Sequence, residues 1–147
     1  MNLNYELLEK DIEYGLTKEK EVEQIIKKYF RMDWFEKLSK FHPMDYEGRR
    51  FGFEGWKYYF EIKSRRFNHD KYKTTIIGKN KIAYCDKYPD DVYFFIFVFE
   101  DGIFYYFYSY AERNKLKSSI CGRSDRGLEE YKLYYHIPIE KLQKINI

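Results

Sequence analysis

Apolar residues recur with the period of a helix in the amino-terminal part of the chain. Within residues 17–31 they occupy the i, i+3, i+4, i+7 and i+8 positions of one stripe, which is typical of a helix that buries one face. These residues are Val22, Ile25, Ile26, Tyr29 and Phe30. Thr17 suits the N-cap, and Gly15 separates this segment from a second helical stretch. The pattern predicts helices at 2–14 and 17–31, and a short third helix at 33–40.

Residues 56–64 are mostly aromatic or β-branched, which favours a strand. Successive side chains of a strand point to opposite faces. One face would then be apolar, and it would carry Trp56, Tyr58, Phe60 and Ile62. The opposite face would carry Glu61 and Lys63 beside Tyr59. The alternation therefore predicts an acid and a base side by side on one face of a strand.

The run from Val92 to Phe99 is almost wholly apolar and suits a strand that is buried on both faces. Asp101-Gly102 predicts a tight hairpin, with a returning strand at 103–110. These two strands are expected at the centre of the sheet. Thr74 to Lys87 is interpreted as a helix, although Gly78 would cost about 1 kcal/mol there. The remaining expected elements are a basic loop at 65–75, a loop at 111–127, a strand at 131–137 and a short helix at 139–145.

Two carboxylates are expected to converge. Glycines 48, 52 and 55 provide turn signals between Asp45 and the strand that carries Glu61, so the chain can fold back and set the two acids side by side. Paired carboxylates bind a hard divalent cation such as Mg²⁺. Lys63, next to them, can orient a water or stabilise negative charge on a phosphate.

Asp45, followed after fifteen residues by Glu61-Ile62-Lys63, resembles the motif of the PD-(D/E)xK nuclease superfamily. Met44 stands where the motif has proline, although Pro43 is one residue earlier. A second Glu-x-Lys triplet occurs at 130–132. Only Asp125 precedes that copy, with too few residues between for a strand and its return, so the first copy is the better candidate. Its alternative reading is an ordinary Glu/Lys pair on an exposed strand.

The resemblance implies an α/β protein with a restriction-endonuclease-like αβββαβ core over roughly residues 15–110, in which helices flank a central mixed sheet. The whole chain, 1–147, would be a single PD-(D/E)xK nuclease-like domain. The segment 71–82 is similar to small stand-alone members from phages and large DNA viruses. The implied activity is that of a Mg²⁺-dependent phosphodiesterase, an endo- or exodeoxyribonuclease that hydrolyses DNA.

The resemblance also implies roles for individual residues. Asp45, Glu61 and the backbone carbonyl of Ile62 would hold Mg²⁺, for which Mn²⁺ would substitute, and Lys63 would position the attacking water. Members of the superfamily commonly add a glutamate from the first core helix, and in several small members a lysine or glutamine from the helix after the triplet reaches the scissile phosphate. Glu19 matches the first best, with Glu21 and Glu23 as alternatives. Lys81 or Lys79 matches the second.

The distribution of charge is compatible with a nucleic-acid substrate. The net charge is only +3, from 27 basic and 24 acidic residues, so the chain is not a polycation. Residues 63–81, however, contain seven Lys or Arg against one acid. Arg65 and Arg66, with Lys79 and Lys81, would hold the phosphate backbone. No segment resembles a base-reading helix, so we expect selectivity for substrate structure or strand type rather than for sequence. DNA is the expected partner, and RNA stays open.

Other classes of protein are disfavoured. No apolar run approaches the roughly 20 residues that span a membrane, and the amino terminus has no signal-peptide pattern, so we expect a soluble intracellular protein, in the cytoplasm or, if viral, in the host cytoplasm or nucleus. The three histidines have no zinc-ligand spacing. A homodimer is a reasonable expectation for a small nuclease that cuts both strands. Two rival functions remain, a catalytically silent nucleic-acid-binding module and a viral protein-interaction factor.

Overall fold

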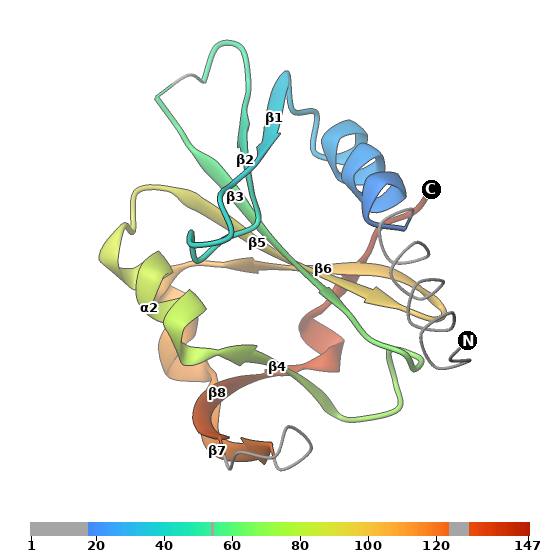
Figure 1. Cartoon of the computed structure of the whole chain (residues 1–147), viewed down its shortest axis with the longest axis vertical. Coiled ribbons are helices and arrows are strands. Elements are labelled where there is room, and N and C mark those ends of the chain that lie inside the picture. The colour runs from blue at the N-terminus through green and yellow to red at the C-terminus, as the bar shows by residue number, and fades with distance from the viewer. Residues whose placement is uncertain (1–17, 54, 124–129) are drawn as a thin grey trace, which may run out of the picture.

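The computed structural model describes residues 18–53, 55–123 and 130–147 (Figure 1). The helix expected at 2–14 lies outside these residues. The second expected helix is confirmed in its described part, where residues 18–29 are helical. Its stripe is buried at Val22 and Ile26, and Phe30 continues it. Among the described residues, no helix is long and apolar enough to cross a membrane.

Six strands form a mixed central sheet in the described part of the chain. In spatial order they are β1 (Trp34–Lys37), β2 (Tyr46–Arg49), β3 (Tyr58–Ser64), β5 (Val92–Phe99), β6 (Gly102–Tyr108) and β9 (Gln143–Lys144). β3 and β5 pair in parallel, and the other neighbours are antiparallel. A second sheet has the order β4 (Thr74–Gly78), β8 (Glu130–Pro138), β7 (Lys117–Arg123). Helix α2 (Lys79–Lys87) connects β4 to β5.

The order from the amino-terminal helix through β1, β2, β3, α2 and β5 is αβββαβ, with β4 added before α2. The expected α/β class with a central mixed sheet is therefore confirmed. β5 lies in the middle of this sheet as expected, whereas β6 has only the two-residue strand β9 beyond it.

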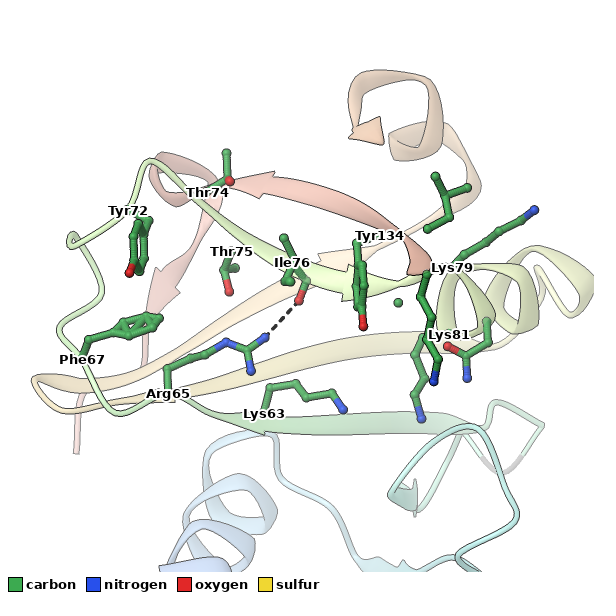
Figure 2. Close-up of a pocket in the computed structure, with 14 residues that line it drawn as sticks. Lys63, Arg65, Phe67, Tyr72, Thr74, Thr75, Ile76, Lys79, Lys81 and Tyr134 are labelled. Atoms are coloured by element: carbon green, nitrogen blue, oxygen red, sulfur yellow. Dashed lines mark hydrogen bonds between the residues drawn. The ribbon is translucent and has the colours of Figure 1, made fainter. Parts of the chain in front are cut away.

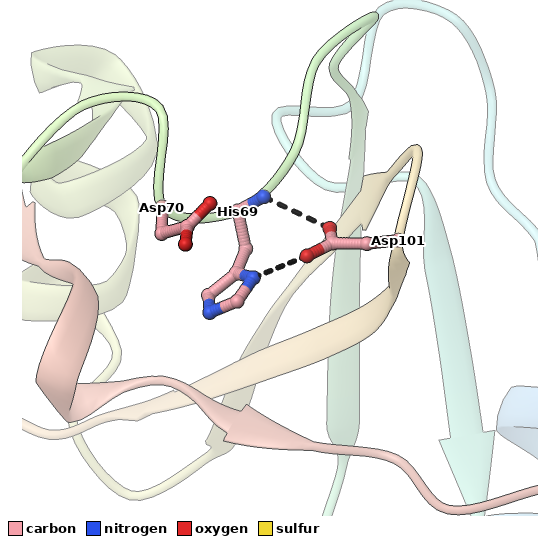
Figure 3. A group of neighbouring side chains, drawn as sticks. All are labelled: His69, Asp70 and Asp101. Carbon is pink, nitrogen blue, oxygen red and sulfur yellow. Dashed lines mark hydrogen bonds and ion pairs between the residues drawn. The ribbon is translucent and has the colours of Figure 1, made fainter.

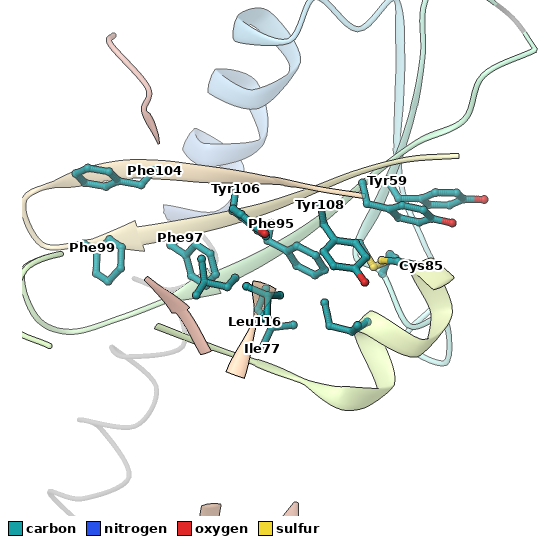
Figure 4. Packing of buried hydrophobic residues seen from close by; sticks show 14 residues of the cluster. Tyr59, Ile77, Cys85, Phe95, Phe97, Phe99, Phe104, Tyr106, Tyr108 and Leu116 are labelled. Carbon is teal, nitrogen blue, oxygen red and sulfur yellow. The ribbon is translucent and has the colours of Figure 1, made fainter. Parts of the chain in front are cut away.

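Apolar side chains pack on both faces of the central sheet. On one face the amino-terminal helix covers Phe60 and Ile96. The ring centroids of Phe30 and Phe60 are 5.3 Å apart. On the other face α2 and the second sheet cover β3, β5 and β6 (Figure 4). Phe95, Ile96 and Phe97 have no exposed surface, so the prediction that 92–99 is buried on both faces is confirmed.

The helix expected at 74–87 is only half right. Thr74–Gly78 forms strand β4, and the helix begins at Lys79. β4 pairs with β8, where Ile77 lies opposite Tyr135, and this pairing buries the side chain of Ile77. Because β-branched residues pack well on a pleated surface, the run before Gly78 is more stable as a strand. Gly78 is extended, with φ −63° and ψ 144°, and serves as the N-cap of α2.

The helix expected at 33–40 is also wrong, because Trp34–Lys37 forms β1. Arg31 has φ 57°, a left-handed conformation that turns the chain after the amino-terminal helix. Phe35 then stacks on Tyr46 of β2 at 4.8 Å, so cross-strand packing decides the conformation. Trp56 was expected on the buried face of the next strand, but β3 begins at Tyr58 and Trp56 is 54% exposed.

The carboxy-terminal third contains more regular structure than expected. The segment read as a loop from 111 onward instead forms a 3-10 helix, η1 (Tyr110–Lys115), and the strand β7. Residues 124–129 lie outside the described part of the chain. The strand expected at 131–137 is confirmed as β8. The closing helix is reduced to a 3-10 turn, η2 (Ile139–Lys141), followed by β9, because Ile145 donates to the carbonyl of Ile103 and joins the sheet edge.

Gly48 provides a test of the packing between β2 and the segment that connects the amino-terminal helix to β1. A Cβ atom at Gly48 would lie 2.5 Å from Sδ of Met32, whereas one at Gly55 would have nothing within 4 Å. We expect Gly48→Ala to lower the free energy of unfolding by about 1–3 kcal/mol, because Met32 must shift within a packed core. Gly55→Ala should change it by less than about 0.5 kcal/mol. Urea denaturation of both variants measures this, and equal stability would contradict the packing described.

Candidate active site

Backbone pairing between β2 and β3 places Asp45 beside Glu61, as expected. The N–H of Asp45 donates to the carbonyl of Phe60 at 3.0 Å, immediately before β2 begins. The carboxylate of Asp45 accepts a hydrogen bond from the N–H of Ile62 at 2.8 Å through Oδ2. Asp45 is thus tied to β3 at the residues on either side of Glu61, and the strand register fixes its position.

Glu61 is the centre of the site. It lies in the middle of β3 and is only 2% exposed. Each of its carboxylate oxygens faces one lysine: Nζ of Lys63 lies 3.2 Å from Oε1, and Nζ of Lys81 lies 3.3 Å from Oε2. Lys81 comes from α2, and its ammonium also donates to the carbonyl of Pro43. One buried carboxylate therefore joins β3, α2 and the segment before β2.

One oxygen of Glu61 accepts no hydrogen bond from the described residues. Oε2 is buried and has no hydrogen bond among the described residues, although the charge of Lys81 is nearby. Burial raises the pKa of Glu61, and the negative charge of Asp45 raises it further. The ammonium groups of Lys63 and Lys81 lower that pKa, but the net shift is upward. The site therefore holds a carboxylate that is costly to keep ionised in the absence of a further cation.

Glu19 approaches the site from the amino-terminal helix. It lines a pocket of about 810 Å³ together with Asp45 and Ile62. Its carboxylate is 2.7 Å from Nζ of Lys37 and accepts a hydrogen bond from the hydroxyl of Tyr46 at 3.1 Å. The hydrogen bond from Lys37 is the main reason that the pKa of Glu19 is lowered, against an opposing effect of burial.

The three carboxylates do not form one compact set of ligands. Oxygen atoms of Glu19, Asp45 and Glu61 do not all lie within 4.8 Å of one another. Of the two alternatives to Glu19, Glu21 is exposed and Glu23 is half-buried.

A groove of about 1000 Å³ lies on the other side of β3, bounded by β3 on one wall and by β4, α2 and β8 on the other (Figure 2). Of the residues expected to hold nucleic acid, Arg65, Lys79 and Lys81 line this groove. The guanidinium of Arg65 donates to the carbonyl of Ile76 at 3.1 Å and so connects the two walls. Arg66 is exposed and lines the pocket of Asp45 instead.

Sequence reasoning missed the part of the groove that comes from distant segments. Lys132 and Tyr134 of β8 line it, as do Phe67 and Tyr72 of the loop before β4. Lys132 and Tyr134 are two residues apart on a strand and so share one face, which was the available signal. That signal does not indicate the groove unless it is known that β8 pairs with β4.

A second cluster of titratable groups joins the loop before β4 to the turn between β5 and β6. His69, Asp70 and Asp101 have potential ligand atoms within 4.8 Å of one another (Figure 3). Asp101 accepts the backbone N–H of His69 at 2.9 Å, and its other oxygen lies 2.5 Å from Nδ1 of the imidazole. The imidazole also stacks on Phe104 at 4.5 Å. These contacts fasten the 65–73 loop to the turn between β5 and β6.

The αβββαβ order, with Glu61 and Lys63 on β3 and Asp45 bonded to the same strand, resembles the arrangement of the PD-(D/E)xK nucleases. A family model described as "Phage putative PDDEXK endonuclease" matches residues 11–145, and the chain belongs to this family. No curated protein and no solved structure matches the chain. The family confirms the resemblance seen in the sequence and implies a hydrolase that acts on nucleic acid. Nucleases of this class generally use divalent metals.

The raised pKa of Glu61 predicts an unusual effect on stability. The folded protein binds the proton of the Glu61 carboxyl more tightly than the unfolded chain does. The free energy of unfolding therefore falls as pH rises from the ordinary glutamate pKa to the raised pKa of the folded protein. We expect Glu61→Gln to raise the melting temperature at pH 7–8, and this gain should vanish as pH falls toward the ordinary glutamate pKa.

Glu112→Gln is the control, because it should change stability at neutral pH in the opposite direction. Burial raises the pKa of Glu112, but its hydrogen bonds with Lys141 and Tyr106 and the nearby lysine charges outweigh this, so the net shift is downward. Its replacement should therefore lower stability at neutral pH and have little effect at low pH. Thermal melts across pH for the wild type and both variants test this. A Glu61→Gln variant that is less stable than the wild type at pH 8 would contradict the electrostatics described here.

Proposed function

We propose that the protein is a metal-dependent nuclease that hydrolyses phosphodiester bonds of DNA. The observation that carries this proposal is the buried carboxylate of Glu61, which lies beside Asp45 and has a lysine at each oxygen. A structural ion pair would not need a second acid next to it, because Asp45 makes ionisation of Glu61 still more costly. Membership of a phage endonuclease family supports the same reading.

The residues at this point fit a hard divalent cation. The buried Oε2 of Glu61 has no hydrogen bond among the described residues, and a cation would satisfy it. Asp45, Glu61 and the backbone carbonyl of Ile62 would hold the ion, and Glu19 would join from the pocket it shares with Asp45. When bound, Mg²⁺ or Mn²⁺ lowers the pKa of a water and neutralises charge on the phosphate.

The two lysines have different surroundings, which suggests different tasks. The side chain of Lys63 is 37% exposed and lines the groove, so its ammonium can orient the attacking water and stabilise the negative charge that develops on the phosphate. Lys81 is 18% exposed and is held between Glu61 and the carbonyl of Pro43. It would keep Glu61 ionised and contact the phosphate from the side of α2.

Arg65, Arg66 and Lys79 would bind the sugar–phosphate backbone on either side of the cleaved bond, since they line the two pockets that adjoin β3. Phosphate contacts position a substrate without reading its sequence. The protein should therefore select DNA by structure or strand type.

Cleavage assays on single-stranded, duplex and branched DNA test this proposal. We expect cleavage with Mg²⁺ or Mn²⁺ that EDTA abolishes. Asp45→Asn, Glu61→Gln and Lys63→Met should each lower the rate by at least about 100-fold. The first two remove carboxylates that would hold the metal ion, and the third removes the ammonium that would orient the attacking water. Lys87→Ala, at the exposed end of α2, is the matched lysine control and should cleave at the wild-type rate.

Two results would contradict the proposal. One is cleavage that survives Glu61→Gln or Asp45→Asn. The other is a wild type that binds DNA but cuts no substrate with either metal, which would indicate a catalytically silent binding module.

The dependence of binding on salt tests the assignment of Arg66. The logarithm of the association constant for DNA should fall linearly with the logarithm of salt concentration, since phosphate contacts release counterions. Arg66→Ala should make this slope shallower by about 1, and Lys87→Ala should leave it unchanged. An unchanged slope in Arg66→Ala would remove Arg66 from the interface.

A further inference from the structure

The groove between β3 and β8 concentrates positive charge. Five cationic side chains line it, and no acid is among the described residues of its lining. They are Lys63, Arg65, Lys79, Lys81 and Lys132. The chain as a whole is almost neutral, so this concentration is local. A groove of one sign with low-dielectric walls attracts a polyanion.

Helix α2 adds to this field because it begins in the groove. Gly78, Lys79 and Asn80 at its start all belong to the lining. The first turn contains no acid, and no side chain caps it. The positive end of the helix dipole therefore acts on the same space as the lysines.

Aromatic rings lie on the wall formed by β8 and at one end of the groove. Figure 2 shows Tyr134 over the middle of the groove, facing Lys63, with Phe67 and Tyr72 at the end beyond Arg65. Tyr72 is 56% exposed, and its ring meets Phe67 edge to face at 5.1 Å. Aromatic side chains beside a cationic track are the features that bind unpaired bases and their phosphates together.

These rings are of use only for a substrate with unpaired bases. In a duplex, neighbouring base pairs cover the faces of each base, so a protein ring can stack on a base only after it leaves the helix. Arg65 also crosses the groove to the carbonyl of Ile76 and restricts its width at that point.

We propose that this groove binds a single polynucleotide strand, with phosphates along Lys63, Lys79 and Lys81 and unpaired bases stacked on Tyr134 and Tyr72. This inference rests on the proposed function, since Lys63 and Lys81 belong to both the groove and the site of cleavage. It deepens that function by naming the substrate as single-stranded or locally unpaired nucleic acid.

Binding in EDTA tests the inference without cleavage. Fluorescence anisotropy would compare a labelled DNA strand, the same strand with abasic spacers in place of its bases, a blunt duplex, and RNA of the same sequence. The wild type should bind the base-bearing strand about 25- to 400-fold more tightly than the abasic one, because the abasic strand loses stacking on both tyrosines. It should also prefer that strand to the duplex.

Tyr134→Ala and Tyr72→Ala should each weaken binding of the base-bearing strand by about 5- to 20-fold and leave binding of the abasic strand unchanged. Tyr134→Phe and Tyr72→Phe keep the ring and should restore the wild-type affinity. Tyr110→Ala is the matched control, since Tyr110 is 58% exposed and lies outside the groove. The abasic strand also detects misfolding, because a misfolded variant would lose its affinity for both strands.

The inference is overturned if the wild type binds the abasic strand or the duplex as tightly as the base-bearing strand. Tighter binding of either the DNA or the RNA strand supports it and identifies the sugar that the groove prefers. Metal-dependent cleavage without any preference for unpaired bases would overturn this inference alone. The stacking preference without cleavage would overturn the proposed function and leave the assignment of the groove intact.

Discussion

A single buried carboxylate organises this protein. Glu61 lies in the central strand β3 and is almost inaccessible to water, with one lysine from its own strand and one from α2 at its two oxygens. Burying a charge is expensive unless it is paired, and here the pairing is incomplete, because Asp45 adds a second negative charge and one oxygen has no hydrogen bond among the described residues. Such an arrangement persists only when the surrounding structure enforces it.

The surrounding structure does so through an unusually aromatic core. Two apolar clusters pack on opposite faces of the central sheet, and the strand next to Glu61 has three successive residues with no exposed surface, Phe95 to Phe97. Close packing of this kind resists rearrangement, so β3 cannot turn its acid toward solvent without flipping a whole strand. The free energy lost by burying this carboxylate is offset by the packing of the core.

The second sheet positions α2 and forms part of the groove next to the candidate site. β4, β8 and β7 lie outside the αβββαβ core, yet β4 leads directly into α2 and so positions Lys81, while β8 supplies Lys132 and Tyr134. Charge, aromatic rings and the carboxylate pair thereby meet around one strand. These three features together agree with membership of a nucleic-acid hydrolase family, and the agreement of all three is stronger evidence than any one of them.

The sequence by itself determined which face of β3 each of its residues occupies. Period-two alternation set Glu61 beside Lys63, and the apolar run at 92–99 required a strand covered on both sides. Only the tertiary structure decided which segments meet. Thr74–Gly78 is a strand because β8, more than fifty residues later, pairs with it, and Lys81 reaches Glu61 because α2 docks on the sheet. Local patterns fix periodicity and orientation, but partners distant in sequence are chosen by packing, which no single segment encodes.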